Sequence, residues 1–384
     1  MCIRDRFQIA GGWGGGTFVG SVGVTLNNLS IKNFFKKGAW RPYPMGQNQR
    51  LSISAQTNGT YYKAFAISFT DPWMGGRKPN SFTISAHYSD ENNAYYAWQK
   101  GTRYFRTAGV AAGLGKRLDW PDPYFTFYAE ASYERYMLKD WNTFVLKNGA
   151  ANLLSIRLVL GRNSVDQPIY PRRGSDFSVS VQLTPPYSLW DGKDYKSTAL
   201  SEQERYNWIE FHKWMLKGQW FTPLTRNGNL VLMARAEMGY LGHYNKNKVS
   251  PFERFEVGGD GMTGYNMYGI DIISMRGYDD GALDPVGSNY SCAYNKYTME
   301  LRYPLLLKGQ TNIYVLGFLE GGNGFTSWKE FSPFKIKRSA GIGVRLFLPV
   351  VGMVGVDWGW GFDPAAGQTK RSGSHIHFTM GMQF

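Results

Sequence analysis

The chain has 384 residues, of which 16% are aromatic and only 19% are charged, and it contains 46 glycines. This composition favours β-structure with many turns, and the length is compatible with one large barrel. No apolar run reaches the roughly 18–20 residues that a membrane-spanning helix needs; the strongest candidate, 347–356, is short and is interrupted by Pro349. The chain is therefore either a soluble β-protein or a membrane β-barrel.

The net charge of +14 is spread along the chain rather than gathered in a dense basic tract. Scattered Lys and Arg residues are typical of loop and interior charges that meet anionic lipid headgroups, so we expect no nucleic-acid partner. Cys2 and Cys292 are two distant thiols and do not make a disulfide framework. Residues 1–6 show no apolar core of a signal peptide, and we expect them to be a residual leader or a non-native segment.

The first expected strand, FQIAGGWGGGTFVGSVGV, covers residues 7–24 and carries six glycines between Gly11 and Gly20. Glycine weakens a strand because it loses more entropy on ordering and has no side chain to pack. We therefore interpret this strand as one that pairs weakly. The alternative is that the glycines form a hairpin loop and bend the sheet.

Alternation of apolar and polar residues predicts five further strands clearly, at 51–58, 82–89, 125–135, 177–184 and 375–384. A soluble sandwich alternates in the same way. The number of strands, about sixteen, their length of about ten residues and the aromatics near their ends are instead typical of an outer-membrane barrel. Lipid offers no hydrogen-bond partners, so such a sheet closes on itself.

The connections between these strands alternate between short and long. An Asn-Gly hairpin is expected at 57–62, and short turns are expected at 70–80 and 162–174. Residues 185–205 are expected to form a long loop with a short helix. A longer insertion runs from about residue 242 to 290, and a loop of that length is usually functional or disordered.

The insertion contains the stretch ISMRGYDD, residues 273–280, and two strands that follow it each carry one acid. Glu300 shares its face with Thr298 and Arg302 by alternation, so we expect it to point into the barrel. Glu320 is expected at the end of the next strand and on the same side, although its neighbours on that face, Leu316 and Phe318, are apolar.

Other chemistry is weakly supported. Residues 259–264 match the spacing G-x-G-x-x-G, but no βαβ unit surrounds them, so we expect no nucleotide. His375 and His377 share one strand face but are too few for a metal site, and the acids at 279, 280 and 284 lack the EF-hand spacing. No Ser-His-Asp or Cys-His pairing stands out, so we expect no catalytic residues, cofactor or metal, and no enzyme.

Several stretches together resemble the BamA-type outer-membrane assembly factors, the family that includes TamA and the mitochondrial Sam pore. They are ISMRGY, the Gly-rich approach FERFEVGGDGMTGYN, the turn FTDPWMGG, the strand opening YPRRGSDFSVSVQ and the terminal Phe384. The resemblance covers about residues 7–384 and implies an all-β transmembrane antiparallel barrel of about 16 strands. It also implies a long inward-folded loop between strands 11 and 12, and a bacterial outer-membrane location.

The resemblance also implies a loop anchor and a lateral gate. In the family the loop arginine pairs with acids on the inner wall, which assigns the anchor to Arg276, Gly277, Tyr278, Glu300 and Glu320. The gate lies where the first strand meets the last one, HIHFTMGMQF. Its expected residues, mostly glycines, are Gly11, Gly12, Gly14, Gly15, Gly16, Gly381 and Phe384.

The implied function is the folding and insertion of unfolded β-barrel clients into outer-membrane lipid, without nucleotide hydrolysis. Accessory assembly lipoproteins are further expected partners. Family members carry POTRA domains before the barrel, and we expect none in this chain. A TamA-like or two-partner-secretion transporter of the same superfamily is the alternative; a passive porin and a barrel enzyme rank below it.

Overall fold

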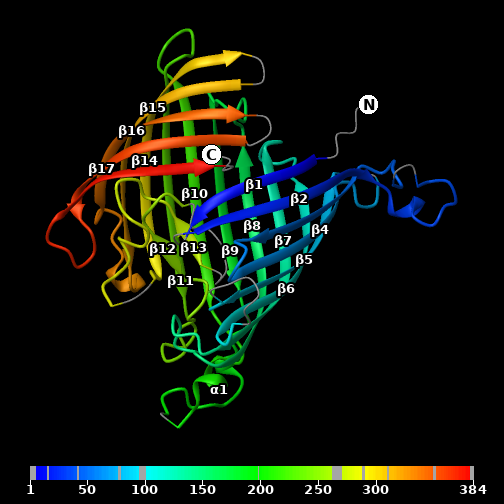
Figure 1. Cartoon of the computed structure of the whole chain (residues 1–384), viewed down its shortest axis with the longest axis vertical. Coiled ribbons are helices and arrows are strands. Elements are labelled where there is room, and N and C mark those ends of the chain that lie inside the picture. Colours follow the sequence, from blue (N-terminus) through cyan, green and yellow to red (C-terminus); the bar gives the residue numbers. More distant parts are fainter. Residues whose placement is uncertain are drawn as a thin grey trace. The chain divides into compact units, whose positions relative to one another are not determined.

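The computed structural model describes most of the chain, as the ribbon in Figure 1 shows. The described residues are 6–14, 17–40, 43–76, 79–94, 101–197, 199–261, 270–287, 290–308, 311–348 and 352–380. Among them, no helix is long and apolar enough to cross a membrane. Within the same ranges, strands β1 to β11 and β14 to β18 form a 16-stranded sheet whose hydrogen-bonded neighbours follow chain order. The two remaining strands, β12 and β13, form a separate pair.

One compact unit comprises residues 1–11, 17–159 and 183–210. Its strands pair antiparallel with the next strand in sequence from β2 to β7. They are β2 (Thr17–Leu29), β3 (Gln49–Thr57), β4 (Tyr62–Asp71), β5 (Asn80–Asn92), β6 (Tyr104–Arg117), β7 (Phe125–Lys139) and most of β8 (Gly149–Asn163). A 3-10 turn, η1 (Ile31–Asn33), follows β2. The alternating segments expected at 51–58, 82–89 and 125–135 are therefore confirmed as strands.

The long loop of this unit contains the expected short helix. It holds the 3-10 turn η2 (Tyr187–Leu189) and the helix α1 (Glu202–Tyr206). Ser201 caps the helix: its hydroxyl accepts the backbone N–H of Glu204, and the Glu204 carboxylate accepts the backbone N–H of Ser201. This reciprocal pair satisfies two backbone donors that a helix of five residues would otherwise leave open.

The prediction of one glycine-rich first strand over residues 7–24 is wrong. The stretch contains two strands, β1 (Arg6–Gly14) and β2, which are neighbours in the sheet. Alternation runs through both strands without a visible break in the sequence, and glycine is the residue type common to weak strands and turns. The alternative interpretation of the glycines, as a hairpin, matches this arrangement better.

The other compact unit comprises residues 12–16, 160–182 and 211–384. Its strands are β9 (Gly174–Leu183), β10 (His212–Pro223), β11 (Val231–Gly242), β12 (Phe255–Val257), β13 (Asp271–Ile273), β14 (Ala293–Lys308), β15 (Thr311–Phe325), β16 (Lys337–Leu348), β17 (Gly352–Pro364) and β18 (Arg371–Met380). A 3-10 turn, η3 (Trp328–Glu330), lies between β15 and β16. Strands β14 to β17 lie side by side, coloured yellow to red in Figure 1.

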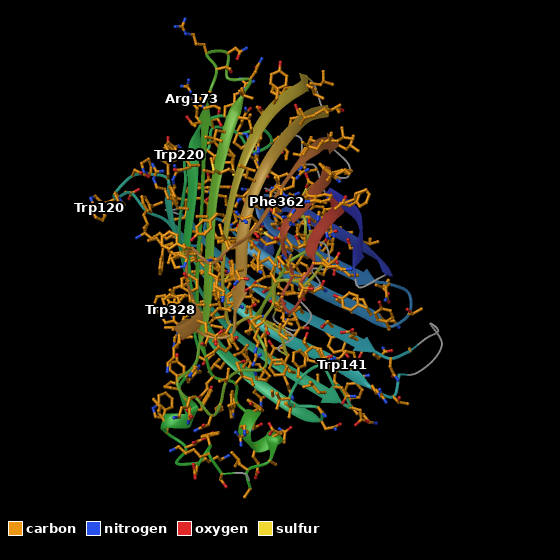
Figure 2. All side chains as sticks on the ribbon, turned by 90° about the vertical axis from the view of Figure 1, so that its left-hand side faces the viewer. Trp120, Trp141, Arg173, Trp220, Trp328 and Phe362 are labelled. Atoms are coloured by element: carbon orange, nitrogen blue, oxygen red, sulfur yellow. The ribbon has the colours of Figure 1, made fainter. Side chains whose placement is uncertain are left out.

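The exposure of side chains on the two faces of these strands is the reverse of that in a soluble protein. On β14, Met299 and Leu301 are 49% and 43% exposed, whereas Glu300 and Arg302 between and beside them are 5% and 1% exposed. Large apolar side chains on the exposed face include Trp220 and Phe362, which are labelled in Figure 2. Exposed apolar and buried charged side chains suit a wall with lipid on one side. We call the two sides the apolar face and the polar face.

Part of the polar face is covered by a hydrophobic cluster that includes Tyr170, Phe221 and Tyr314. Tyr170 belongs to the stretch YPRRG in the connection between β8 and β9. Its ring packs edge-on against Tyr314, with centroids 5.2 Å apart, and its hydroxyl donates to the carbonyl oxygen of Arg302 at 3.0 Å. The expected turn at 162–174 is therefore present, and its tyrosine reaches the strands that carry the site.

Candidate functional site: an insertion held on the polar face

Residues 243–292 form the insertion, which connects the eleventh and twelfth strands of the sheet, β11 and β14. This confirms the predicted place of the long loop. Short backbone pairs give the insertion its own frame: β12 pairs parallel with β13, and Gly259 bridges to Met275. A Cβ atom on Gly258 would lie 2.3 Å from the carbonyl oxygen of Asp279. The glycine-rich approach is thus needed for close packing against the Arg-Gly-Tyr turn.

The Arg276 guanidinium is buried on the polar face and contacts three strands. Its Nη2 atom lies 2.7 Å from Oε1 of Glu300 on β14 and 2.7 Å from Oε1 of Glu320 on β15. The Nε atom and the backbone N–H also donate to Glu320, at 3.1 and 2.9 Å. The Nη1 atom forms a longer ion pair with Asp357 on β17, at 3.6 Å. We call Arg276 with these three carboxylates the arginine anchor.

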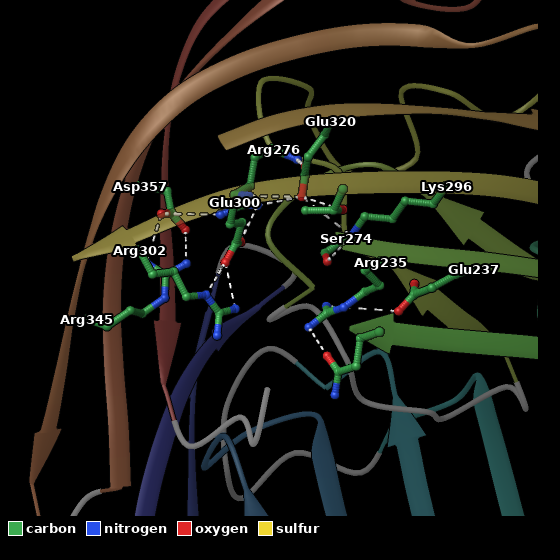
Figure 3. Close-up of polar contacts among 12 residues, drawn as sticks. Arg235, Glu237, Ser274, Arg276, Lys296, Glu300, Arg302, Glu320, Arg345 and Asp357 are labelled. Carbon is green, nitrogen blue, oxygen red and sulfur yellow. Dashed lines mark hydrogen bonds and ion pairs between the residues drawn. The ribbon is translucent and has the colours of Figure 1, made fainter. Parts of the chain in front are cut away.

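Each carboxylate of the anchor is shared with a second cation from the sheet (Figure 3). Arg302 donates to Glu300 through Nη2 at 2.6 Å, and Arg345 holds both oxygens of Asp357 at 2.8 and 2.7 Å. The second cation at Glu320 is Lys296, with its Nζ atom at 3.8 Å. Four cations therefore face three carboxylates. Since buried charges are costly without partners, this sharing is what allows the cluster to stay ionised.

Burial and charge act in opposite directions on Arg276. Burial alone would lower the pKa of the guanidinium, but the carboxylates of Glu320, Glu300 and Asp357 outweigh it and raise the pKa above its ordinary value. The arginine therefore stays charged at any pH at which the fold exists. A guanidinium also presents several donors in a fixed plane, so the anchor specifies direction as well as distance.

The apolar neighbours of Glu320 have a direct role. The Arg276 guanidinium carbon lies 3.7 Å from the centroid of the Phe318 ring, close enough for a cation–π contact. Phe318 stands directly across from Glu300 in the register of β14 and β15. The expectation that Glu320 lies at the end of its strand is wrong, because β15 continues to Phe325 through a stretch rich in glycine. Glycine often marks a strand end, but the backbone of Gly321 and Gly322 remains extended and paired within β15.

Gly277 packs backbone to backbone on β17. Its φ is +86°, and a Cβ atom there would lie 2.9 Å from Cβ of Ser339 and 3.0 Å from the nitrogen of Gly361. Gly359 and Gly361 have equally little room, since a Cβ on either would come within 2.7 Å of Gly277 backbone atoms. The stretch WGWGF on β17 therefore directs aromatics to the apolar face and leaves a smooth track of glycines on the polar face.

His377 and Tyr278 complete the contacts of the turn with the sheet. The backbone N–H of Gly277 donates to Nε2 of His377 at 2.8 Å, so this ring nitrogen carries no proton in the docked arrangement. The Tyr278 hydroxyl donates to the carbonyl oxygen of Arg338 on β16 at 2.9 Å, and its ring is fully buried. The turn is thus held by β14, β15, β16, β17 and β18.

A second ionic contact holds the other end of the insertion. The buried Nζ atom of Lys213, on β10, lies 3.1 Å from Oε2 of Glu253 and 2.7 Å from Oδ2 of Asp271. Glu253 has a φ of +63°, which is uncommon for a residue other than glycine. Lys213 therefore joins the residues that precede β12 to the start of β13, on the same strand pair that positions the Arg-Gly-Tyr turn.

The structure brings together all five residues assigned to the loop anchor, and it adds partners that the sequence analysis did not identify. These are Asp357, Arg302, Arg345, Lys296, His377 and the Lys213 contact. Of the expected gate residues, Gly11, Gly12 and Gly14 lie in β1. Gly15, Gly16, Gly381 and Phe384 lie outside the described residues. The gate therefore stays a prediction.

Asp284 lies near the end of the insertion, and we expect it to make the packing of residues 279–287 against the rest of the protein pH-dependent. Its Oδ1 atom accepts the Ser291 hydroxyl at 2.5 Å and the Val257 N–H at 3.2 Å, whereas Oδ2 is buried without a hydrogen bond. Burial raises the pKa of Asp284 to about 8. The folded form thus binds a proton that the unfolded segment, with a pKa of about 3.9, releases, so stability falls as pH rises from about 4 to 8.

The expected result is faster hydrogen exchange in residues 279–287 at pH 8.5 than at pH 6, after correction for intrinsic exchange rates. Asp284→Asn should flatten this difference, because the amide stays neutral throughout. Asp119→Asn, at an exposed position on the turn after β6, serves as the control for loss of a carboxylate. A pH difference in Asp284→Asn as large as in the parent protein would contradict the assignment.

Comparisons with known proteins agree with the fold and with the place of the insertion. The model of the Omp85 superfamily domain matches residues 45–384. The outer membrane protein assembly factor BamA of Neisseria meningitidis serogroup B is 23% identical over 328 residues, 79% of this chain and 33% of that protein. The chain thus spans about a third of the length of that relative.

Solved structures show the same fold at lower identity. BamA from Haemophilus ducreyi, in a form lacking POTRA domains 1–3, superposes with a TM-score of 0.66 at 17% identity, over 98% of this chain and 68% of that one. CdiB from Escherichia coli superposes with a TM-score of 0.54 at 12% identity, over 98% of this chain and 67% of that one. These likenesses concern the fold of the sheet.

Proposed function

Because the chain belongs to the Omp85 superfamily, whose members are outer-membrane β-barrels, we propose that it folds and inserts β-barrel proteins into the outer membrane. Its proposed partners are unfolded barrel clients, outer-membrane lipid and accessory assembly lipoproteins. The supporting observation is the insertion held on the polar face by Arg276, which occupies the interior side of the wall where a passive pore would need open space. The Neisseria relative is an outer membrane protein assembly factor, which supports the same proposal.

The mechanism we propose uses the first strand as a template. Edge strands present unpaired N–H and C=O groups, to which an extended client segment adds by β-augmentation. Three glycines in the second half of β1 reduce the side-chain packing that would hold it to a partner strand. Opening between β1 and β18 would therefore be less costly than opening elsewhere, and strand exchange needs no nucleotide.

A cysteine pair across the seam tests this mechanism. One cysteine is placed in β1 and one in β18, with Cys2 and Cys292 replaced by serine and alanine. The full chain is then reconstituted into vesicles. Folding of an unfolded client barrel, measured by its protection from protease, should be accelerated by the reduced variant and should return to the rate of empty vesicles in the oxidised one. The reduced protein is its own matched control.

The same vesicles distinguish the assembly factor from the second candidate function, a secretion transporter of the same superfamily. The similarity of the fold to CdiB supports this second candidate. Acceleration that persists in the oxidised variant would argue against opening at the seam. Absence of acceleration in both forms, together with passage of an extended polypeptide into the vesicle lumen, would favour the transporter over the assembly factor.

A further inference from the structure

A pocket lies at the end of strands β16, β17 and β18, apart from the arginine anchor. It has a volume of about 520 Å³ and is lined by Arg338, Phe362, Asp363, Pro364, Thr369 and Arg371. Two arginines and a threonine thus line one hollow, and Lys370 is adjacent in sequence. Because guanidinium groups bind phosphate in a planar, bidentate manner, this set of donors matches an anionic phosphate.

The charge of the pocket is only partly neutralised from within. Arg338 is bound by Asp363, whose Oδ1 and Oδ2 atoms accept from Nη2 at 3.0 Å and from Nε at 3.1 Å. Arg371 is exposed and stands directly across from Pro364 in the register of β17 and β18. Two lining cations therefore face one lining carboxylate, and the remaining positive charge is available to an anion.

The apolar face of β17 leads directly to this pocket. Trp358, Trp360 and Phe362 occupy alternate positions and are all exposed, and Phe362 is also part of the pocket wall. Ile376 and Phe378 extend the exposed apolar surface onto β18. A ligand with apolar chains along this stripe would place a polar headgroup at the strand ends, as amphipathic aromatic belts do at membrane interfaces.

From this arrangement we propose that the pocket binds the anionic phosphate headgroup of a membrane lipid, with its acyl chains on the Trp358–Phe362 stripe. The site also borders the insertion. The carbonyl oxygen of Arg338 accepts the Tyr278 hydroxyl, and the backbone N–H of Ala366 donates to the carbonyl oxygen of Ala282 at 2.9 Å. A bound headgroup would therefore brace the strand ends that hold the Arg-Gly-Tyr turn.

Native mass spectrometry of the detergent-solubilised full chain tests the proposal. The probes are short-chain phosphatidylglycerol, short-chain phosphatidylcholine and inorganic phosphate. Loss of one charge-assisted contact should weaken phosphatidylglycerol binding by about tenfold in Arg371→Gln. Arg371→Lys, which keeps the charge but loses the planar fork, should be intermediate. Arg226→Gln, on the exposed connection between β10 and β11, should bind as the parent protein does.

Three results would overturn the proposal. One is parental affinity for phosphatidylglycerol in Arg371→Gln. Another is equal binding of phosphatidylcholine, because the site would then not select anionic headgroups. The third is displacement of phosphatidylglycerol by inorganic phosphate at equal concentration, because the apolar stripe would then contribute nothing. Protease protection of residues 279–287 on addition of phosphatidylglycerol, lost in Arg371→Gln, would support the link to the insertion.

Discussion

Arg276→Ala is expected to release the insertion from the polar face and to lower the unfolding temperature of the chain. Removing one partner of a buried ion pair costs about 3–5 kcal/mol, largely because the other charge is left uncompensated. Glu320 is the carboxylate most affected: it loses both of its contacts to the Arg276 guanidinium, and its remaining cation, Lys296, is 3.8 Å away. Glu300 and Asp357 keep Arg302 and Arg345.

Two measurements check this expectation separately. Limited proteolysis of the folded protein should show new cleavage within residues 243–292, and heating before gel electrophoresis should unfold the sheet at a lower temperature. Arg226→Ala, which removes an exposed arginine outside the cluster, is the matched control and should change neither. Unchanged profiles for Arg276→Ala in both measurements would contradict the anchor.

A double variant separates loss of the anchor from the cost of a stranded charge. In Arg276→Ala with Glu320→Gln, the uncompensated carboxylate is replaced by a neutral amide of similar shape. We expect part of the lost stability to return, although the insertion stays loose, because the two effects have different origins. Greater destabilisation in the double variant than in Arg276→Ala would show that Glu320 has an adequate partner without the arginine.

The polar face could be predicted from the sequence where alternation is regular, and less well where glycine interrupts it. Glu300 lies between Met299 and Leu301, so its direction follows from the period of two alone. Asp357 follows the same rule, but its neighbours on the polar face, Gly355 and Gly359, have no side chains and give no sign of a face. The same lack of signal made β1 and β2 look like one strand.

Contacts inside the insertion were beyond sequence reasoning for a different reason. Lys213, Glu253 and Asp271 are separated by long stretches of chain, and no strand period relates a residue on β10 to residues in an irregular loop. The path of such a loop depends on backbone pairs that form only in three dimensions, such as β12 with β13. The resemblance to a known family supplied the partners of Arg276, and nothing comparable pointed to Lys213.

Gly277→Ala is expected to undock the Arg-Gly-Tyr turn while the arginine anchor keeps all its charged groups. A φ of +86° costs a residue with a Cβ about 1–2 kcal/mol, and the new methyl group would overlap Ser339 and Gly361. Overpacking of this kind adds about 1–3 kcal/mol. Cleavage within residues 243–292 should therefore increase nearly as much as in Arg276→Ala.

A substitution on the β17 side of this contact shows whether the close packing around Gly277 or its backbone conformation holds the turn. Gly361→Ala places a methyl group 2.4 Å from the Gly277 carbonyl oxygen, at a position whose φ lies outside the left-handed region. Gly317→Ala, on β15, is the matched control, because a Cβ there meets no atom closer than 4.0 Å. If close packing holds the turn, Gly361→Ala loosens the insertion and Gly317→Ala does not. If only Gly277→Ala has an effect, the glycine track on β17 plays no part in docking, and the turn depends on the backbone conformation of Gly277 alone.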